Sequence, residues 1–205
     1  MAAKKKVAAK KPAAKAKPAP KAKPAQKAKP APKPGGPWAA TFAPRAPGER
    51  RYWLVKSEPT VFSFSDLLAA PAKTTCWDGV RNYAARNFIR DGMKLGDGVL
   101  FYHSMTDGQS IAGVCEVVRE AYPDHTALDA KHPHFDPESD AAAPTWFMVD
   151  VRATERFTAP VTLAAIKARK ELAAMALLRI GRLSVTPVTA AEWAVIRSMS
   201  GATPA

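Results

Sequence analysis

Residues 3–34 repeat Ala, Lys and Pro, and no compact fold can be built from such a segment. Val7 is its only aliphatic side chain larger than alanine, so nothing in it can collapse into a core and offset the entropy lost on folding. Proline disfavours helix, and the lysines repel one another. We therefore predict a disordered basic tail over residues 1–50, a folded domain over residues 51–200, and a short C-terminal tail over residues 201–205.

The charge of the chain divides at the same place. Residues 1–50 carry 14 basic side chains and one acidic side chain, residues 51–205 carry 17 of each, and the whole chain has a net charge of +13. A block of like charge is typical of an arm that binds an acidic polymer, because each Lys that neutralises a phosphate releases counterions. The tail composition is similar to that of linker-histone-like proteins, although a solubilising tail or a spacer is the alternative. The lysines expected to contact the nucleic-acid backbone are Lys4, Lys5, Lys6, Lys10, Lys11, Lys15, Lys17, Lys21, Lys23, Lys27, Lys29 and Lys33.

The cysteines and the lengths of the apolar stretches limit where the protein is expected in the cell. Cys76 and Cys115 lie far apart and form no Cys-x-x-Cys pair, so free thiols in a reducing compartment are the simplest interpretation. No apolar stretch approaches membrane-spanning length, and no apolar run follows the first lysines as it would in a secretory signal. We expect a cytoplasmic, nucleoid- or chromatin-associated protein with a monomeric body and no membrane partner.

Hydrophobic periodicity and turn residues predict a domain dominated by strands. A long loop rich in Pro, Asp and His is expected over residues 121–145. Since no regular alternation of strand and helix appears, the pattern favours a small mixed barrel over a doubly wound sheet. Strands are predicted at 52–56, 99–103, 111–119, 145–155 and 183–188, and helices at 63–70, 83–91, 163–169, 171–179 and 190–199.

Four stretches are specific enough to indicate a family. They read Tyr-Trp-Leu-Val-Lys-Ser-Glu-Pro at 52–59, Cys-Trp-Asp-Gly-Val-Arg-Asn-Tyr at 76–83, Phe-Tyr-His-Ser at 101–104, and Arg-Leu-Ser-Val-Thr-Pro-Val at 182–188. With Tyr122-Pro123-Asp124 and Trp146 in order between them, the chain resembles an EVE domain from about residue 52 to residue 199.

The resemblance implies an α+β fold, namely a mixed β pseudo-barrel of the PUA-like superfamily with peripheral helices, related to the YTH domain. It also implies a reader of modified bases, chiefly modified cytosines in DNA. Ala84 and Thr186 stand where relatives often carry Gln. The identity of the modification is therefore left open.

The residues themselves agree with a base-binding pocket. A base that is read singly must leave its stack and meet aromatic faces and a few polar groups. Trp77 lies beside a glycine turn and polar neighbours, which suits one wall of a pocket, although core packing is the usual role of a lone Trp. Asn82 suits the pairing edge of a base, but it could instead cap the helix that follows it.

The remaining candidates also have two interpretations each. Lys56 and Ser57 end a predicted strand, and in the similar YTH pattern such a pair contacts backbone and base; a solvated strand end is the alternative. His103 could bond a base or a phosphate, or it could be a satisfied barrel histidine. The predicted pocket residues are Lys56, Ser57, Trp77, Asp78, Gly79, Val80, Arg81, Asn82, Tyr102, His103, Ser104, Arg182 and Ser184, with Tyr122, Pro123 and Asp124 as a pocket lid.

Catalysis and metal binding have no comparable signal. His132-Pro133-His134 resembles a metal motif superficially, but proline holds the loop extended and no thiolate accompanies it. No nucleophile elbow, phosphate loop or dinucleotide fingerprint appears. We predict a non-enzymatic binding module without cofactor or metal, whose partner is nucleic acid, DNA in preference to RNA. A YTH-type reader of modified RNA and, behind it, an enzyme acting on nucleotides are the alternatives.

Overall fold

The computed structural model describes residues 38–104 and 108–200, so the tail lysines predicted to contact nucleic acid lie outside the described residues. In the described part, six strands form one mixed sheet in the order β2-β5-β4-β3-β1-β6. The strands are β1 (Tyr52–Ser57), β2 (Thr74–Cys76), β3 (Gly98–His103), β4 (Ser110–Pro123), β5 (Phe147–Thr162) and β6 (Val185–Val188).

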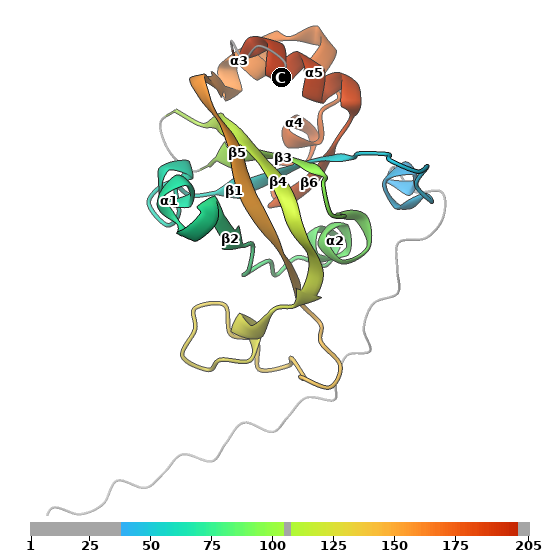
Figure 1. The fold of residues 1–205 in the computed structure, drawn as a ribbon, viewed down its shortest axis with the longest axis vertical. Helices are drawn as coiled ribbons and strands as arrows, with labels where there is room; N and C mark the ends of the chain where they lie inside the picture. Colours follow the sequence, from blue (N-terminus) through green and yellow to red (C-terminus); the bar gives the residue numbers. More distant parts are fainter. Residues whose placement is uncertain (1–37, 105–107, 201–205) are drawn as a thin grey trace, which may run out of the picture.

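The sheet is open, with β2 and β6 as its two edges, and helices lie around it (Figure 1). β1 and β3 pair in parallel, and the other neighbours pair antiparallel. The α+β class with a mixed sheet and peripheral helices is therefore confirmed, although the strands do not close into the predicted barrel among the described residues. The helices are α1 (Phe64–Ala69), α2 (Tyr83–Asn87), α3 (Leu163–Ala168), α4 (Ala176–Arg179) and α5 (Ala190–Met199), with short turns η1 (Ala39–Phe42), η2 (Pro71–Lys73), η3 (Phe88–Gly92), η4 (His125–Ala127) and η5 (Lys170–Leu172).

In the described part, α1, α2, α3 and α5 each begin at a residue whose side chain caps the helix, whereas α4 has no side-chain cap. The Ser63 hydroxyl accepts a hydrogen bond from the Asp66 backbone N–H, and the Asp66 side chain bonds back, which starts α1 where the sequence predicts. Thr189 and Glu192 make the same capping box on α5, which spans the predicted residues 190–199. No helix in the described ranges is long and apolar enough to cross a membrane.

β4 and β5 are both longer than the sequence predicts. They form a twisted hairpin of 14 and 16 residues, and the 121–145 loop between them projects at one end of the molecule (Figure 1). The pairing between them shifts register at four places, from Ile111 to Tyr122. Because such bulges interrupt the alternation of apolar and polar residues, period-two patterns show only part of each strand.

Apolar residues pack on both faces of the sheet. Trp53 and Phe101 lie in a cluster with α1 and η3, while Leu54 and Tyr102 lie in a second cluster with α3 and α5. Successive side chains of β1 and β3 thus point to opposite faces of the sheet, as strand geometry predicts. The first cluster is the one that supports the site described below.

The ordered body begins before residue 50. Phe42 of η1 stacks on Phe88 with ring centroids 5.6 Å apart. Arg45 donates two hydrogen bonds to Asp97, at 2.6 and 2.7 Å, and Asp97 is almost fully buried. Residues 38–50 therefore pack against the domain, although the sequence places them in the tail. The sequence signal for this packing is weak, since two aromatic residues and two arginines stand among prolines and alanines.

Candidate functional site

A cavity of about 450 Å³ opens at the C-terminal end of β1, beside β2 and the turn that follows it. We call it the Trp77 pocket. It brings together seven of the predicted pocket residues, which come from three separate stretches of the chain: Lys56, Ser57, Trp77, Asp78, Gly79, Val80 and Ser184. Its other lining residues are Glu58, Val61, Phe62, Thr75, Cys76 and His134.

Trp77 serves both the core and the pocket. Its ring packs edge-on against Phe101, with centroids 5.4 Å apart, and its backbone N–H donates to the Val149 carbonyl at 2.7 Å. The Trp77 side chain is 8% exposed, and it lines the cavity with this exposed part. The two interpretations of Trp77 are thus compatible, because its core contacts fix the ring that forms a pocket wall.

The turn after Trp77 needs glycine at position 79. Gly79 has φ +70°, and a Cβ there would lie 2.2 Å from Nδ1 of His134. A larger residue would therefore strain the backbone and displace His134. This close approach places a histidine of the 121–145 loop against the pocket turn.

Charged groups of both signs line the pocket. Lys56 Nζ donates to the Gly181 carbonyl at 2.9 Å, and burial lowers the pKa of Lys56. Oδ1 of Asp78 lies 3.8 Å from Nδ1 of His134, and Oδ2 lies 3.8 Å from the Cys76 sulfur. Burial, together with the charges of Asp78 and Asp150, raises the pKa of the Cys76 thiol. An ammonium donor and a carboxylate acceptor in one cavity can bind a polar edge of a ligand.

Arg81 and Asp124 hold the loop against the turn, and neither lines the pocket. Asp124 accepts hydrogen bonds from the Gly79 N–H at 3.0 Å and from Arg81 Nη1 at 2.7 Å. Arg81 also donates to the His134 carbonyl. Burial alone would raise the pKa of Asp124, but the hydrogen bonds from Arg81, Thr126 and Gly79 outweigh it and lower that pKa. These contacts form what we call the Arg81 clamp.

The predicted lid is only partly as expected. Tyr122 and Pro123 are the last residues of β4, and Asp124 caps η4, so the lid residues support the loop from below the pocket. His134, ten residues further along the same loop, is the residue that reaches the cavity. In the same loop, His132 Nδ1 accepts a hydrogen bond from the His134 N–H.

Four further candidates have structural contacts outside the pocket lining. Asn82 takes the capping role, since its side-chain oxygen accepts from the Ala84 and Ala85 N–H groups at 2.9 and 3.2 Å. His103 Nε2 accepts from the Phe64 N–H, which is the satisfied alternative. Tyr102 is buried in the second apolar cluster. The Ser104 N–H and hydroxyl both donate to the Ser57 carbonyl, so Ser104 positions a residue that does line the pocket.

Ala84 and Thr186, the two positions noted in the sequence as departures from the family pattern, do not line the cavity. Ala84 is exposed on α2, and Thr186 is fully buried on β6 opposite Leu54. The Thr186 hydroxyl has no hydrogen-bond partner among the described residues. Neither residue lines the Trp77 pocket as the structure stands.

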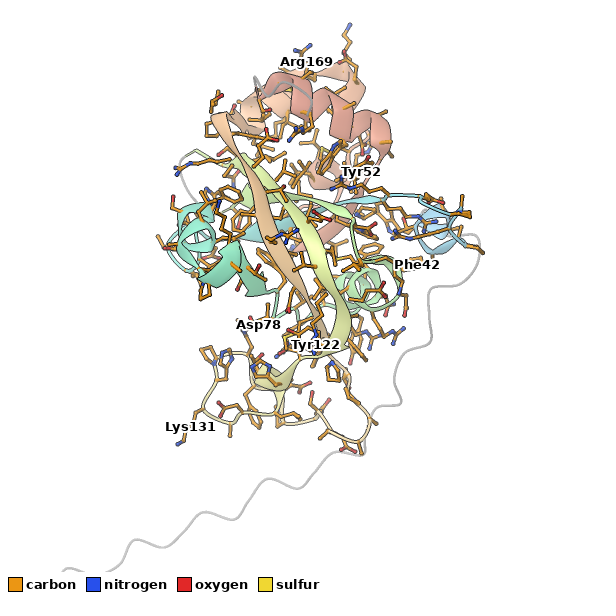
Figure 2. The ribbon with its side chains drawn as sticks, viewed as in Figure 1. Phe42, Tyr52, Asp78, Tyr122, Lys131 and Arg169 are labelled. Atoms are coloured by element: carbon orange, nitrogen blue, oxygen red, sulfur yellow. The ribbon has the colours of Figure 1, made fainter. Side chains whose placement is uncertain are left out.

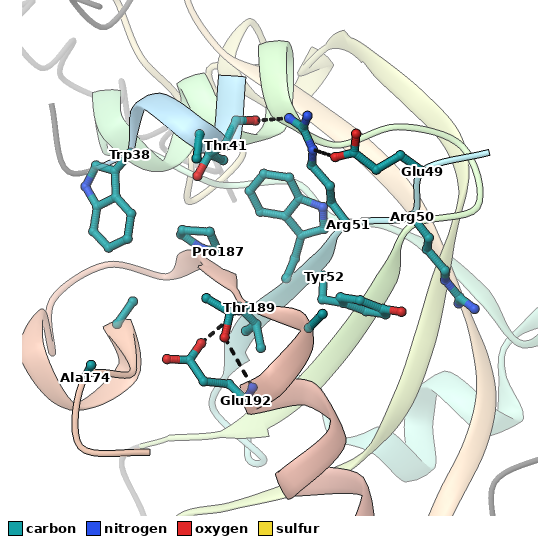
Figure 3. A pocket seen from close by; sticks show the side chains of 15 residues that line it. Trp38, Thr41, Glu49, Arg50, Arg51, Tyr52, Ala174, Pro187, Thr189 and Glu192 are labelled. Atoms are coloured by element: carbon teal, nitrogen blue, oxygen red, sulfur yellow. Dashed lines mark hydrogen bonds and ion pairs between the residues drawn. The ribbon is translucent and has the colours of Figure 1, made fainter. Parts of the chain in front are cut away.

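A larger cavity, of about 520 Å³, lies at the other end of β1, between residues 38–53 and the start of α5 (Figure 3). Its polar side chains are largely engaged with one another and with backbone. Arg51 bonds Glu49 and the Thr41 carbonyl, each at 2.6 Å, and Glu192 accepts from the Thr189 N–H. Its other walls are mainly apolar, including Trp38 and Pro187. We favour the Trp77 pocket as the functional site because its charged groups face the cavity and its motifs converge there.

Within residues 38–104 and 108–200, no three His, Cys, Asp or Glu side chains converge where they could hold a metal ion.

Comparison with known proteins identifies the family. The EVE domain model matches residues 51–199, which is most of the chain and includes every residue of the Trp77 pocket. This chain belongs to the EVE domain family. Human thymocyte nuclear protein 1 is 42% identical over 170 residues, covering 75% of this chain and 75% of that protein.

Comparison with solved structures agrees with this family. Human THYN1, solved in complex with DNA containing 5-methylcytosine, is 42% identical and superposes with a TM-score of 0.72, covering 75% of this chain and 99% of that one. A hypothetical protein from Leishmania major is 50% identical with a TM-score of 0.71, covering 75% and 96%. The predicted family and fold are therefore confirmed.

Proposed function

We propose that this EVE domain reads modified bases by binding one extruded modified cytosine of DNA in the Trp77 pocket. The observation that carries the proposal is the similarity to human THYN1, which was solved with DNA containing 5-methylcytosine. The convergence of Lys56, Trp77 and Asp78 on one cavity supports the position of the site.

The chemistry of the pocket suits cytosine. A cavity of about 450 Å³ lies within the size range of small-molecule sites, and Trp77 offers an aromatic wall against which a base can pack. The Asp78 carboxylate can accept from the exocyclic amino group of cytosine, and Lys56 can donate to its ring acceptors. Thymine carries a carbonyl where cytosine carries that amino group, so Asp78 would repel it. Binding of this kind involves no catalytic step.

The basic tail would supply affinity without selectivity. Residues 51–205 carry no net charge, so the folded body has little long-range attraction for DNA. The lysines of residues 1–50 would neutralise phosphates irrespective of sequence. The EVE domain and the tail thus divide selection and attraction between them.

Replacement of Trp77 tests the proposal. We expect Trp77→Ala to reduce the preference for a 5-methylcytosine oligonucleotide over the unmodified one by about tenfold or more, because stacking on an aromatic side chain contributes about 1–3 kcal/mol per base. Trp193→Ala is the matched control, since Trp193 stacks on Tyr52, away from this pocket. The measurement is fluorescence anisotropy with both oligonucleotides, in deoxyribose and ribose forms.

The outcomes separate cleanly. A loss of preference in Trp77→Ala alone supports the proposal. An unchanged preference in a folded Trp77→Ala variant places the base elsewhere. If the ribose oligonucleotide is bound more tightly than the deoxyribose form, the natural ligand is RNA.

A further inference from the structure

A short turn beside the Trp77 pocket presents an apolar side chain between two arginines. α4 ends at Arg179, and Ile180, Gly181 and Arg182 then lead toward β6. Ile180 is 36% exposed, and both arginines are exposed. The turn thus presents one apolar side chain flanked by two cations at the protein surface.

Hydrogen bonds fix this turn at the pocket. Lys56, which lines the cavity, donates to the Gly181 carbonyl at 2.9 Å. The Ile180 N–H donates to the Ala176 carbonyl at 2.9 Å, which closes the last turn of α4. Leu183 is buried in the first apolar cluster, and the next residue, Ser184, lines the pocket. The Ile180 side chain is therefore exposed on a turn anchored on both sides of it.

The charge around the turn favours a polyanion. Arg179 and Arg182 form no ion pair within the part of the chain that the structure describes. Residues 163–184 carry five basic side chains and one acidic side chain, whereas the 121–145 loop carries five acidic side chains and one Lys. Figure 2 shows these two regions at opposite ends of the molecule, marked by Arg169 and Lys131. DNA bound at the pocket is thus attracted toward the end that carries Ile180.

Extrusion of a base leaves a gap in the stack of a duplex. An apolar side chain can fill that gap, and proteins that distort DNA frequently insert Ile, Leu, Met or Phe side chains between base steps. Building on the proposed function, we infer that the Arg179–Arg182 turn enters duplex DNA, with Ile180 filling the space left by the extruded base. Arg179 and Arg182 would contact the flanking phosphates.

An exposed apolar residue outside the pocket serves as a control. Leu95 is 64% exposed and is not among the residues that line the Trp77 pocket. Leu95→Ala therefore removes exposed apolar surface without touching the pocket or the Arg179–Arg182 turn.

The test compares duplex and single-stranded DNA with the full chain. Each oligonucleotide carries one 5-methylcytosine, and dissociation constants are measured for the unaltered chain, Ile180→Ala and Leu95→Ala. We expect Ile180→Ala to weaken duplex binding about tenfold and single-strand binding less than about twofold, because a single strand has no gap to fill. Arg179→Ala should flatten the salt dependence by about one phosphate contact.

Each result bears on one claim. A duplex-specific loss in Ile180→Ala, absent in Leu95→Ala, supports the inference. Equal losses on both substrates, or no loss on either, overturn the inference about Ile180. In that case the proposed function still holds if the unaltered chain prefers the modified base. If the unaltered chain shows no such preference on either substrate, the proposed function and this inference fail together.

Discussion

At the scale of single residues, His103 shows how a polar side chain near the site can serve the fold. Its Nε2 accepts a hydrogen bond of 3.0 Å from the Phe64 N–H, at the first turn of α1. A protonated imidazole has no acceptor, so this bond requires the neutral ring. Burial accordingly lowers the pKa of His103 below its ordinary value of about 6.5.

This bond predicts a pH-dependent stability. Because the folded pKa of His103 is lower than the unfolded one, its contribution is complete above about pH 6.5 and is lost as the pH falls toward the folded pKa. We expect the free energy of unfolding, measured in urea, to decrease over that window. His103→Gln should flatten the decrease, whereas His125→Gln, at an exposed position, should leave it unchanged.

Among the pocket residues, those within uninterrupted motifs could be predicted from sequence. Lys56, Trp77 and Ser184 each belong to a motif that the fold brings to the cavity. His134 could not be assigned to the pocket, because its position depends on the Arg81 clamp, a contact between residues 53 apart in the chain. Cys76 was assessed only for metal and nucleophile chemistry, although it directly precedes Trp77.

At the scale of elements, the Arg81 clamp joins the pocket turn to the 121–145 loop. Asp124 has a fully buried side chain, while that of Arg81 is 23% exposed. Removing the arginine would leave a buried carboxylate with fewer donors, which is costly. The position of His134 at the pocket should therefore depend on this pair.

Arg81→Ala tests the clamp. We expect a loss of about 1–3 kcal/mol in the free energy of unfolding, together with faster amide hydrogen exchange across residues 125–136. Arg152→Ala is the control, because Arg152 and Glu116 form an exposed pair at 3.8 Å that should contribute little. Unchanged exchange in the loop of Arg81→Ala would show that other contacts hold it in place.

Helices and strands with a clear apolar pattern could be predicted from the sequence, whereas short or irregular ones could not. α5 and β1 combine capping or alternation with clear apolar periodicity, and the structure places them within a residue of the prediction. β2 is only three residues long, which gives no periodicity to detect. The predicted helix over 83–91 divides into α2 and the π-helical turn η3, a change of hydrogen bonding that apolar spacing does not show.

At the scale of the whole molecule, the proposed division of labour separates a neutral body from a basic tail. The structure refines where to test it, because residues 38–50 pack against the body through Phe42 and Arg45. A deletion ending at residue 50 would remove these contacts, so a change in DNA affinity could not be distinguished from a loss of stability of the domain. A deletion of residues 1–37 avoids that problem.

Removal of residues 1–37 should change affinity but not selectivity. Each phosphate that the tail lysines neutralise contributes about 0.9 to the slope of log affinity against log salt. We expect the slope to flatten, while the ratio of affinities for modified and unmodified oligonucleotides stays within about twofold. Loss of that ratio on deletion would show that the tail takes part in base selection.

Occupancy of the Trp77 pocket is the central claim, and Cys76 reports on it directly. The chain has two cysteines; Cys76 lines the pocket, and Cys115 is fully buried, with a pKa that burial raises. A maleimide should therefore label Cys76 first. The measurement is the labelling rate of the full chain by mass spectrometry, with modified or unmodified oligonucleotide bound to the same extent. We predict that DNA with 5-methylcytosine slows labelling of Cys76 at least about tenfold relative to unmodified DNA; equal rates with the two would contradict a base held in this pocket.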